Sequence, residues 1–403
     1  MIDVDPESFL VIAAVSALAA FVSAFLGRRI AVPVVVLEIL AGIVVGPELL
    51  GLVQPDDFVD FFASLGLGML FFFAGYEIDF ERIRGVPLRL AVVGWLISLA
   101  VAYSLGGLLA LAGVVLSLVF TGSAMATTAI GTLIPILSDA GELRTRFGTY
   151  LLAAGAAGEF GPILLITLVF SAKSTAGNAL ILVMFIVLAA ITAVVAVRGV
   201  TRGWAMLERT LEASSQPAIR IAVLLVFSLA ALAASLGLDL LLGGFVAGVI
   251  ARLALRGREV HVLESKLTAV GYGFLIPFFF ISSGVKFNLT ALTEDPVRLL
   301  ELPLFLALFL VVRGAPALLL YRRVLDGFDR VALALFSATE LPLVVAITTI
   351  AVDHGHMRSS TAASLVGAAI LSTMLYPLLA LRLRRDRARD SVPDDRTVSA
   401  EIG

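Results

Sequence analysis

Residues 147–170, FGTYLLAAGAAGEFGPILLITLVF, form an apolar run in which Glu159 is the one charged residue. An α-helix rises about 1.5 Å per residue, so this run is long enough to cross a bilayer, with Glu159 near the middle. An acidic residue there costs at least about 2.5 kcal/mol, and such residues usually serve ions or protons. The alternative is a structural glutamate held by a partner on another helix. The run therefore predicts a transmembrane helix with a candidate ion or proton site.

The composition excludes most other classes of protein. The 403 residues are 60% hydrophobic and 15% charged, with a mean hydropathy of +1.05. Soluble domains are about half apolar and about a quarter charged, so this chain is not a water-soluble globule. Its apolar runs are too long, and alternate too little, for the strands of a membrane β-barrel. The absence of cysteine excludes disulfides, thiolate metal sites and cysteine catalysis. The expected fold class is an all-α integral membrane protein.

The chain divides into thirteen hydrophobic segments, at residues 8–26, 31–46, 57–77, 88–112, 115–137, 147–170, 177–197, 218–236, 238–254, 268–285, 299–320, 330–352 and 360–381. If these segments alternate in direction, 24 of the 28 Lys and Arg residues in the loops and at the segment ends fall on one side. Positive loops stay in the cytoplasm, which predicts an external amino terminus and a cytoplasmic carboxyl terminus in the cell (inner) membrane. The acidic start, MIDVDPES, lacks a basic region, so we expect a retained first helix rather than a signal peptide.

Two pairs of short motifs indicate an internal repeat. LAGIVVG at 40–46 resembles VAGVI at 246–250, and GYEID at 75–79 resembles GVKFN at 284–288, each after an FFF run. The first pair joins the second segment to the ninth, and an odd displacement reverses the direction across the membrane. The pattern predicts an inverted-topology repeat, as in several secondary transporters. The alternative is chance similarity between apolar helices of low complexity.

Two segments contain polar interruptions, one in each half of the chain. Residues 121–129 read TGSAMATTA, and residues 337–342 read SATELP. In inverted-repeat transporters, discontinuous helices expose backbone at mid-membrane, where it can bind an ion. Hydroxyls, carbonyls and carboxylates are the hard oxygen ligands that alkali cations prefer. The candidate residues are Ser123, Thr127, Thr128, Ser337, Thr339, Glu340 and Pro342.

Arg313 is the one basic residue deep inside a hydrophobic segment, more than three residues from either end. A permanently charged guanidinium at that depth needs a carboxylate partner, and Glu38, Glu159 and Glu340 are the candidates. Arg313 therefore either balances an intramembrane acid or competes with a transported cation. Glu340 is equally well interpreted as an ion ligand or as the salt-bridge partner of Arg313. Thr127 and Thr128 have an alternative as well, because threonine hydroxyls often join membrane helices by hydrogen bonds.

Several motifs in a fixed order give the chain a family resemblance. They are PVVVLEILAGIVVGP at 33–47, FFFAGYEID at 71–79, SAMATTA at 123–129, LLGGFVAG at 241–248, IPFFFISSG at 276–284, VVRGAP at 311–316 and TELPLVVA at 339–346. Through them, the chain resembles the monovalent cation:proton antiporter family from about residue 8 to 385. The matching branch contains bacterial sodium/proton antiporters and glutathione-gated potassium efflux systems.

The resemblance implies an inverted-repeat sodium/proton antiporter fold of about 13 transmembrane helices, with two crossing discontinuous helices. It divides residues 1–385 into a dimerisation part (about 8–77 and 218–285), a linker helix (about 177–197) and an ion-carrying core (about 88–170 and 299–381), followed by a short tail at 386–403. It implies a homodimer in membrane lipid, with a cation and protons as substrates, no cofactor, no nucleic acid and no metal beyond the transported cation.

The resemblance also assigns roles to residues. Glu159 takes the place of the essential acid, Arg313 that of the basic residue, and Thr127 and Thr128 the broken part of the first crossing helix. Family members usually have aspartate at the position of Glu159, preceded by Asp, Asn or Gln, whereas this chain has Gly158. If Glu159 is the one carrier, a single acid favours one proton exchanged per cation.

The implied function is secondary active exchange of Na+ or K+ for protons by alternating access, in pH homeostasis. Burial favours the protonated form of Glu159 and a bound cation favours the ionised form, so the two exclude each other. Alternatives are a channel-like or symporter use of the fold, or a non-transporting sensor. An enzyme has the least support: His261, His354 and His356 are expected in loops, and Glu38 and Asp79 are expected to be structural charges.

Overall fold

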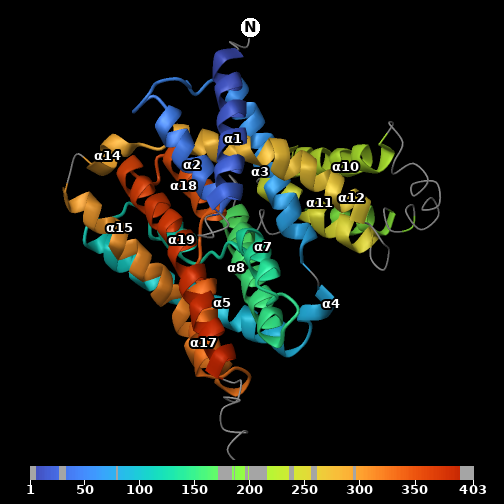
Figure 1. The fold of residues 1–403 in the computed structure, drawn as a ribbon, viewed down its shortest axis with the longest axis vertical. Helices are drawn as coiled ribbons and strands as arrows, with labels where there is room; N and C mark the ends of the chain where they lie inside the picture. The colour runs from blue at the N-terminus through green and yellow to red at the C-terminus, as the bar shows by residue number, and fades with distance from the viewer. Residues whose placement is uncertain are drawn as a thin grey trace, which may run out of the picture. The chain divides into compact units, whose positions relative to one another are not determined.

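The computed structural model describes residues 6–26, 33–78, 80–170, 184–185, 187–195, 198, 216–235, 240–255, 261–293 and 296–390. Throughout these ranges the regular structure is helical (Figure 1). The chain forms two compact units, Met1–Phe80 with Glu159–Ala291, and Glu81–Gly158 with Leu292–Gly403. Each unit therefore combines a stretch from the first half of the chain with a stretch from the second half.

The first unit contains helices α1 (Pro6–Leu26), α2 (Val34–Val45), α3 (Asp57–Tyr76), α10 (Pro217–Ser235), α11 (Leu240–Ala254), α12 (His261–Val270) and α13 (Ile276–Val285). The first unit ends at Ala291, inside the short α14 (Leu289–Thr293). A π-helical turn, Gly271–Leu275, joins α12 to α13. His261 therefore begins a helix, where the sequence had suggested a loop.

The second unit contains α5 (Val86–Leu111), α6 (Leu118–Met125), α7 (Ile130–Asp139), α15 (Pro296–Phe309), α16 (Ala315–Leu320), α17 (Gly327–Ser337), α18 (Pro342–Asp353) and α19 (Ser359–Asp390). The short α4 (Phe80–Ile83) precedes α5, and a π-helical turn, Leu310–Gly314, joins α15 to α16. The division between the units falls inside α8 (Arg146–Phe170), after Gly158.

The helices have the length and polarity of membrane spans. Seven continuous stretches of the described chain have at least 18 residues and are apolar enough to cross a bilayer, and four shorter apolar helices accompany them. The prediction of an all-α, multi-pass membrane protein is confirmed. Most of the segment expected at 177–197 lies outside the described residues, so the count of thirteen helices stays a prediction. The division into dimerisation part, linker and core stays a prediction as well.

The two interrupted helices predicted from the polar motifs are present. The segment expected at 115–137 is divided into α6 and α7, with Ala126–Ala129 between them, and the segment expected at 330–352 is divided into α17 and α18. Ser123 lies in the last turn of α6, Ser337 is the last residue of α17, and Thr339 lies in the second break. Pro342 begins α18, a position where proline's missing N–H costs nothing.

Glycines allow helices of the first unit to pack backbone to backbone. A Cβ added to Gly75 would overlap Phe245 O of α11, and one added to Gly248 would overlap Phe72 O of α3. The same holds between α2 and α13, at Gly42 and Gly284. Within the first unit, α3 thus packs on α11 and α2 packs on α13, and the internal repeat itself stays a prediction. Such contacts are typical of membrane helices, which associate largely through close packing.

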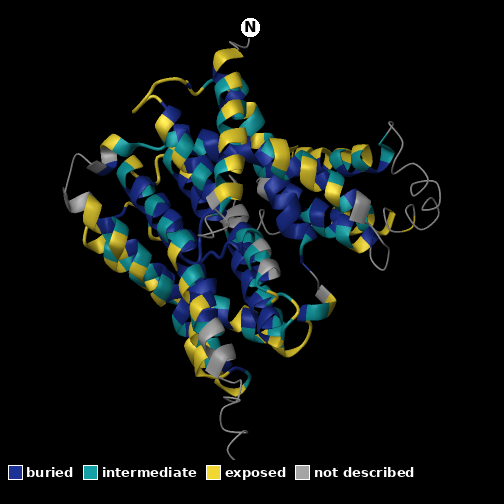
Figure 2. Ribbon diagram, viewed as in Figure 1, coloured by how far each residue is buried: buried dark blue, intermediate teal, exposed yellow. Residues whose placement is uncertain are grey.

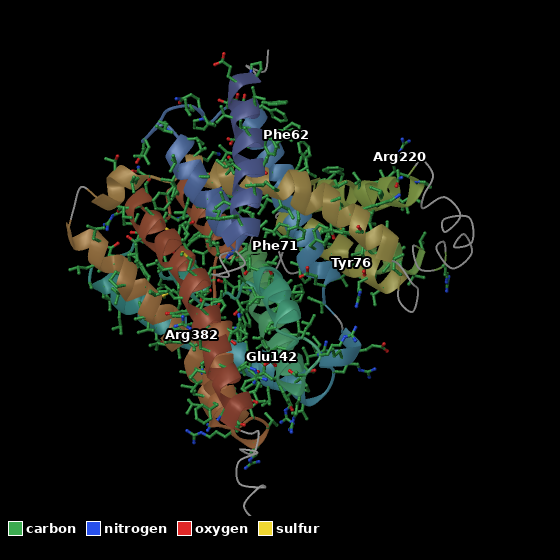
Figure 3. All side chains as sticks on the ribbon, in the orientation of Figure 1. Phe62, Phe71, Tyr76, Glu142, Arg220 and Arg382 are labelled. Atoms are coloured by element: carbon green, nitrogen blue, oxygen red, sulfur yellow. The ribbon has the colours of Figure 1, made fainter. Side chains whose placement is uncertain are left out.

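The remaining core of the first unit is apolar and aromatic. The rings of Phe9 and Phe278 lie 4.9 Å apart and those of Phe62 and Phe278 5.4 Å apart, joining α1, α3 and α13. Figure 3 labels Phe62 of α3. Glu38 lies among these helices, within α2 and buried. Asp79, the other charge expected to be structural, lies outside the described residues.

A charged cluster holds the end of α19 within the second unit. Arg384 donates to Glu142 Oε1 at 2.8 Å and to Oε2 at 2.7 Å, and it also pairs with Asp329 of α17. Its guanidinium lies 3.9 Å from the centre of the Phe147 ring. These side chains are largely shielded, so salt screens the pairs less than it screens exposed salt bridges. Figure 3 labels Glu142, in the turn before α8.

Figure 2 shows buried residues concentrated in α18 and along α19, in contrast to the largely exposed α1.

The close packing of α3 on α11 predicts a specific sensitivity. Gly248→Ala should destabilise the protein by about 1–3 kcal/mol, because the added carbon would overlap backbone that cannot move independently. Gly68→Ala, in α3, is the matched control, since no heavy atom lies within 4 Å of its added carbon. The thermal unfolding midpoint in detergent should fall for Gly248→Ala and hold or rise for Gly68→Ala. Equal midpoints for the two variants would contradict the packing described.

Candidate functional site

The two helix breaks meet in the second unit through their backbones. Ala129 N donates to Thr339 O at 2.8 Å, which ties the first break to the second. Thr128 N donates to Gly158 O of α8 at 3.1 Å, and the Thr128 hydroxyl donates to Ser337 O at 2.5 Å. Backbone groups freed inside a membrane must find partners in the protein, and these bonds supply them. The breaks and α8 are thereby held at one place.

The two threonines of the first break are fully buried but differ in their bonds. Thr127 Oγ1 donates to Ala124 O at 3.0 Å, within its own helix. Thr128 Oγ1 lies 2.8 Å from Thr127 O as well as 2.5 Å from Ser337 O. Hydrogen bonding between helices, the alternative to ion binding, therefore describes Thr128 in this structure. The role of either residue in cation binding stays a prediction.

Arg313 lies in the π-helical turn Leu310–Gly314 and points into this region. Its Nε donates to Thr128 Oγ1 at 2.9 Å, Nη1 to Ser98 Oγ at 3.2 Å and Nη2 to Ala154 O at 3.1 Å. Single π-helical turns within α-helices are frequent at functional sites. All three acceptors are neutral, and within the described residues no carboxylate forms an ion pair with this guanidinium. Glu340 is close enough to attract it electrostatically.

Glu340 is completely buried in the second break. Both carboxylate oxygens lack a hydrogen-bond partner in the described part of the protein, although Thr127 lies nearby. Its backbone is held by α19: Glu340 N donates to Ser372 Oγ at 3.0 Å, and Thr373 Oγ1 donates to Glu340 O at 3.2 Å. The role proposed for Glu340 in charge compensation stays a prediction. Sequence reasoning missed Ser372 and Thr373, whose signal is a pair of adjacent hydroxyls in the apolar stretch at 365–381.

Glu159 belongs to the first unit and has a second acid close by. Its side chain is 5% exposed, and Oε2 has no hydrogen-bond partner among the described residues. Glu77, directly after α3, is near enough to interact electrostatically, and its Oε2 is likewise unpartnered. Tyr272, in the π-helical turn Gly271–Leu275, is close to both carboxylates. Two ionised carboxylates that are near enough to interact repel each other. Their repulsion favours uptake of a proton or a cation.

Glu77 is the main functional candidate that sequence reasoning missed. The sequence analysis singled out Asp79 of the GYEID motif, and Glu77 of the same motif is near enough to Glu159 to interact electrostatically. The available signal was its position at the very end of a phenylalanine-rich helix, where an acid is still within an apolar environment.

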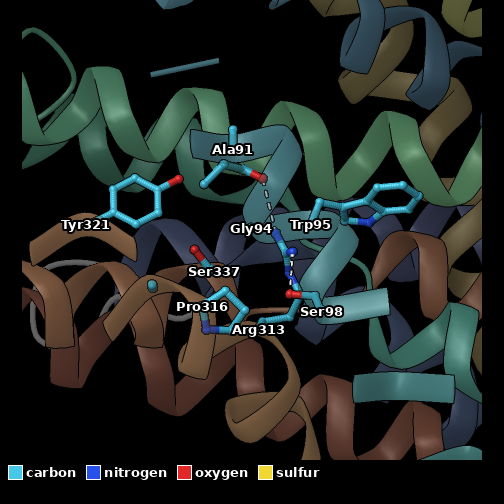
Figure 4. Close-up of a pocket in the computed structure, with 10 residues that line it drawn as sticks. Ala91, Gly94, Trp95, Ser98, Arg313, Pro316, Tyr321 and Ser337 are labelled. Carbon is cyan, nitrogen blue, oxygen red and sulfur yellow. Dashed lines mark hydrogen bonds between the residues drawn. The ribbon is translucent and has the colours of Figure 1, made fainter. Parts of the chain in front are cut away.

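A small cavity adjoins Arg313 within the second unit (Figure 4). It has a volume of about 10 Å³, close to the room that one water molecule requires. Ser98, Tyr321 and Ser337 line it with Arg313, and Ser337 Oγ makes no hydrogen bond to the described protein. Elsewhere in the described chain, no group of three or more His, Cys, Asp or Glu side chains is placed to hold a metal ion.

A helical membrane protein with two joined helix breaks, and with buried acids and a basic residue close to them, has the architecture of a secondary ion transporter. Residues 16–381 match the family described as "Sodium/hydrogen exchanger, transmembrane". The chain belongs to the sodium/hydrogen exchanger family. Its members are transporters rather than enzymes.

Similarity to individual proteins agrees with this membership. A Bacillus subtilis protein named as a candidate Na+/H+ antiporter, YjbQ, is 26% identical over 93% of this chain, which spans 62% of that relative. The Na+/H+-K+ antiporter GerN of Bacillus cereus is 24% identical over 87% of this chain and 90% of its own length. The sodium proton antiporter MjNhaP1 of Methanocaldococcus jannaschii superposes with a TM-score of 0.69, at 16% identity, over 97% of this chain and 99% of that one. The expected antiporter-type fold is confirmed.

The link between α19 and the second break predicts a loss of stability. Ser372→Ala removes the acceptor for Glu340 N and leaves a buried N–H without a partner, which should cost about 1–3 kcal/mol. The control is Ser104→Ala on α5, an exposed serine bonded to its own helix at Ala100 O. Unfolding in detergent should show a lower midpoint for Ser372→Ala alone. A loss of the same size in both variants would argue against the anchoring role of Ser372.

Proposed function

We propose that this protein is a secondary active antiporter that exchanges a monovalent cation for protons. The observation that carries the proposal is the Glu159 carboxylate, which is buried in an apolar helix, has one oxygen without a partner among the described residues, and interacts electrostatically with Glu77. A structural glutamate would be satisfied by hydrogen bonds or an ion pair, whereas a carrier must keep an oxygen free for its ligand. The relatives named as Na+/H+ antiporters support the same activity.

Competition at one carboxylate explains how the exchange is coupled. Burial in an apolar environment favours the protonated, neutral acid, while a cation at close range favours the ionised acid. Proton and cation therefore exclude each other on Glu159. Alternating access then requires that the neutral forms, proton-bound or cation-bound, cross between the two sides of the membrane. Obligatory exchange follows because the empty, charged carboxylate is the form that crosses least readily.

The cation is proposed to be sodium or potassium, bound by hard oxygen ligands. Glu159 supplies the carboxylate, and Thr127, Thr128 and the backbone next to Gly158 supply neutral oxygens in the proposed site. Sodium and potassium use the same kinds of ligand, and the relative GerN is named as a Na+/H+-K+ antiporter. We further propose a homodimer in the cell (inner) membrane, with an external amino terminus and a cytoplasmic carboxyl terminus, acting in pH homeostasis.

Removing the charge of Glu159 should abolish exchange. Glu159→Gln mimics the protonated acid and can neither release a proton nor balance a cation, so the rate should fall to that of protein-free vesicles. The measurement is dissipation of a proton gradient in sealed vesicles on addition of sodium, potassium or lithium. Glu301→Gln is the matched control, because Glu301 is equally buried, at 5% exposed, and is bonded by Ser364. Full exchange in Glu159→Gln would refute the proposal, and cation flux without proton counterflow in the wild type would favour a channel.

Glu77 should assist cation binding without carrying the proton. In Glu77→Gln, the apparent KM for the cation should rise about tenfold, equivalent to about 1.4 kcal/mol, because the second negative charge near Glu159 is lost. The maximal rate should stay within about twofold of the wild type. An unchanged KM would show that Glu77 is a structural acid, and complete loss of exchange would make it a second carrier.

A further inference from the structure

Gly158 faces the guanidinium of Arg313 at very short range. A Cβ added to Gly158 would lie 2.7 Å from Thr128 Oγ1 and closer still to Arg313 Nη2. Real Cβ atoms essentially never approach other heavy atoms to less than 3.0 Å. The position of the guanidinium in this structure is thus incompatible with any side chain at residue 158.

The place that Arg313 occupies is built from three separate parts of the second unit. Ser98 Oγ comes from α5, Thr128 Oγ1 from the first helix break, and Ala154 O from α8, one turn before Gly158. Arg313 is 4% exposed, and each of its three nitrogens donates to one of these oxygens. We call this set the arginine seat: Ser98, Thr128, Ala154 and Gly158.

The arginine seat holds the guanidinium by hydrogen bonds to neutral oxygens and not by an ion pair with one of its members. None of the seat oxygens carries a formal charge, and within the described chain no carboxylate pairs directly with Arg313. A fixed positive charge in a poorly screened environment strongly repels a second cation nearby. This repulsion is strongest for a cation at Thr128, because the Thr128 hydroxyl is hydrogen-bonded to the guanidinium.

The hydrogen bond from Arg313 also uses one of the two lone pairs of the Thr128 hydroxyl. A hydroxyl has one proton to donate and two lone pairs to accept. The proton of Thr128 is directed to a backbone carbonyl, that of Ser337 or of Thr127, and one lone pair accepts the bond from Arg313 Nε. A cation that used Thr128 Oγ1 as a ligand would have to bind in direct contact with a guanidinium.

We propose that Gly158 is a positioning residue for Arg313, and that the guanidinium seated against it keeps a cation from using Thr128 as a ligand until the guanidinium leaves. The first half of this inference concerns packing alone. The second half rests on the proposed exchange function, because it concerns access of the transported cation. Gly158 would thereby set which oxygens of the break are open to the cation.

The packing half is tested by a double-mutant cycle in detergent. Gly158→Ala and Arg313→Ala are made singly and together, and the thermal unfolding midpoint of each is measured. Gly158→Ala should lower the midpoint by several degrees when Arg313 is present and by clearly less when it is absent, because removing the guanidinium removes the tightest overlap. Equal losses in the two backgrounds would overturn the inference.

Gly155→Ala is the matched control, one turn earlier on α8. Its added carbon would meet the Ile130 side chain, with Cδ1 at 2.5 Å, and not Arg313. Gly155→Ala should change the thermal unfolding midpoint by the same amount with and without Arg313. If Gly158→Ala alone does not fold, Ser98→Ala replaces it in the cycle, since it removes the acceptor of Nη1. If Ser98→Ala and Arg313→Ala lower the unfolding midpoint additively, the proposed arginine seat is wrong.

The cation half is tested by binding, without transport. Ligands that bind the folded protein raise its unfolding midpoint in proportion to ln(1 + [L]/Kd). Sodium and potassium are titrated against wild type, Arg313→Ala and Gly155→Ala, with choline chloride as the control for ionic strength. The half-saturating cation concentration should fall at least tenfold in Arg313→Ala and stay unchanged in Gly155→Ala.

Different results would contradict the packing part and the cation-blocking part of the proposal. An unchanged or higher half-saturating concentration in Arg313→Ala would overturn the blocking role of Arg313 while leaving cation exchange intact. Absence of any cation effect in all three proteins would count against the proposed function and the blocking role together. The seat would in that case still be decided by the double-mutant cycle.

Discussion

The hydrogen bond from Ala129 N to Thr339 O is the constraint on which the functional region depends. Each interrupted helix leaves backbone donors and acceptors open at a depth where water and lipid cannot satisfy them. The two breaks solve this problem jointly, since each supplies partners for the other and α8 and α19 supply the rest. A helix break is thus stable here only because a second break lies next to it.

Buried charges in this protein are handled in contrasting ways. Within the described residues, Arg313 donates its hydrogen bonds to neutral oxygens, whereas Glu340 has a well-held backbone and a carboxylate without hydrogen bonds. In the described part of the first unit, Glu159 and Glu77 each have an oxygen without a partner. A structure selected for stability alone would pair these groups or replace them with apolar residues. Unpaired acids are instead what a reversible exchange of protons and cations requires.

Glycine acts in two ways in this chain, and the difference matters for interpreting substitutions. Gly42, Gly75, Gly248 and Gly284 bring helix backbones together in the first unit, and their effect is on packing. Gly158 makes room for a charged side chain, and its effect is on the position of a charge. The two uses look identical in the sequence, because both place a small residue in an apolar helix.

The sequence by itself determined the membrane class, the two interrupted helices and the residues that carry charge at depth. These follow from local properties: length and apolarity define a span, polar and proline residues interrupt it, and a charge such as Glu159 stands out because burying it is costly. Only the tertiary structure decided what those charges contact. Arg313 was expected to have a carboxylate partner, yet it is bonded to Ser98, Thr128 and Ala154 O, and Glu77, which the sequence did not single out, is an acid near enough to Glu159 to interact electrostatically. Such contacts join residues more than eighty positions apart in the chain, or for Arg313 about 160 to 215, and they depend on how helices pack, which local periodicity does not encode.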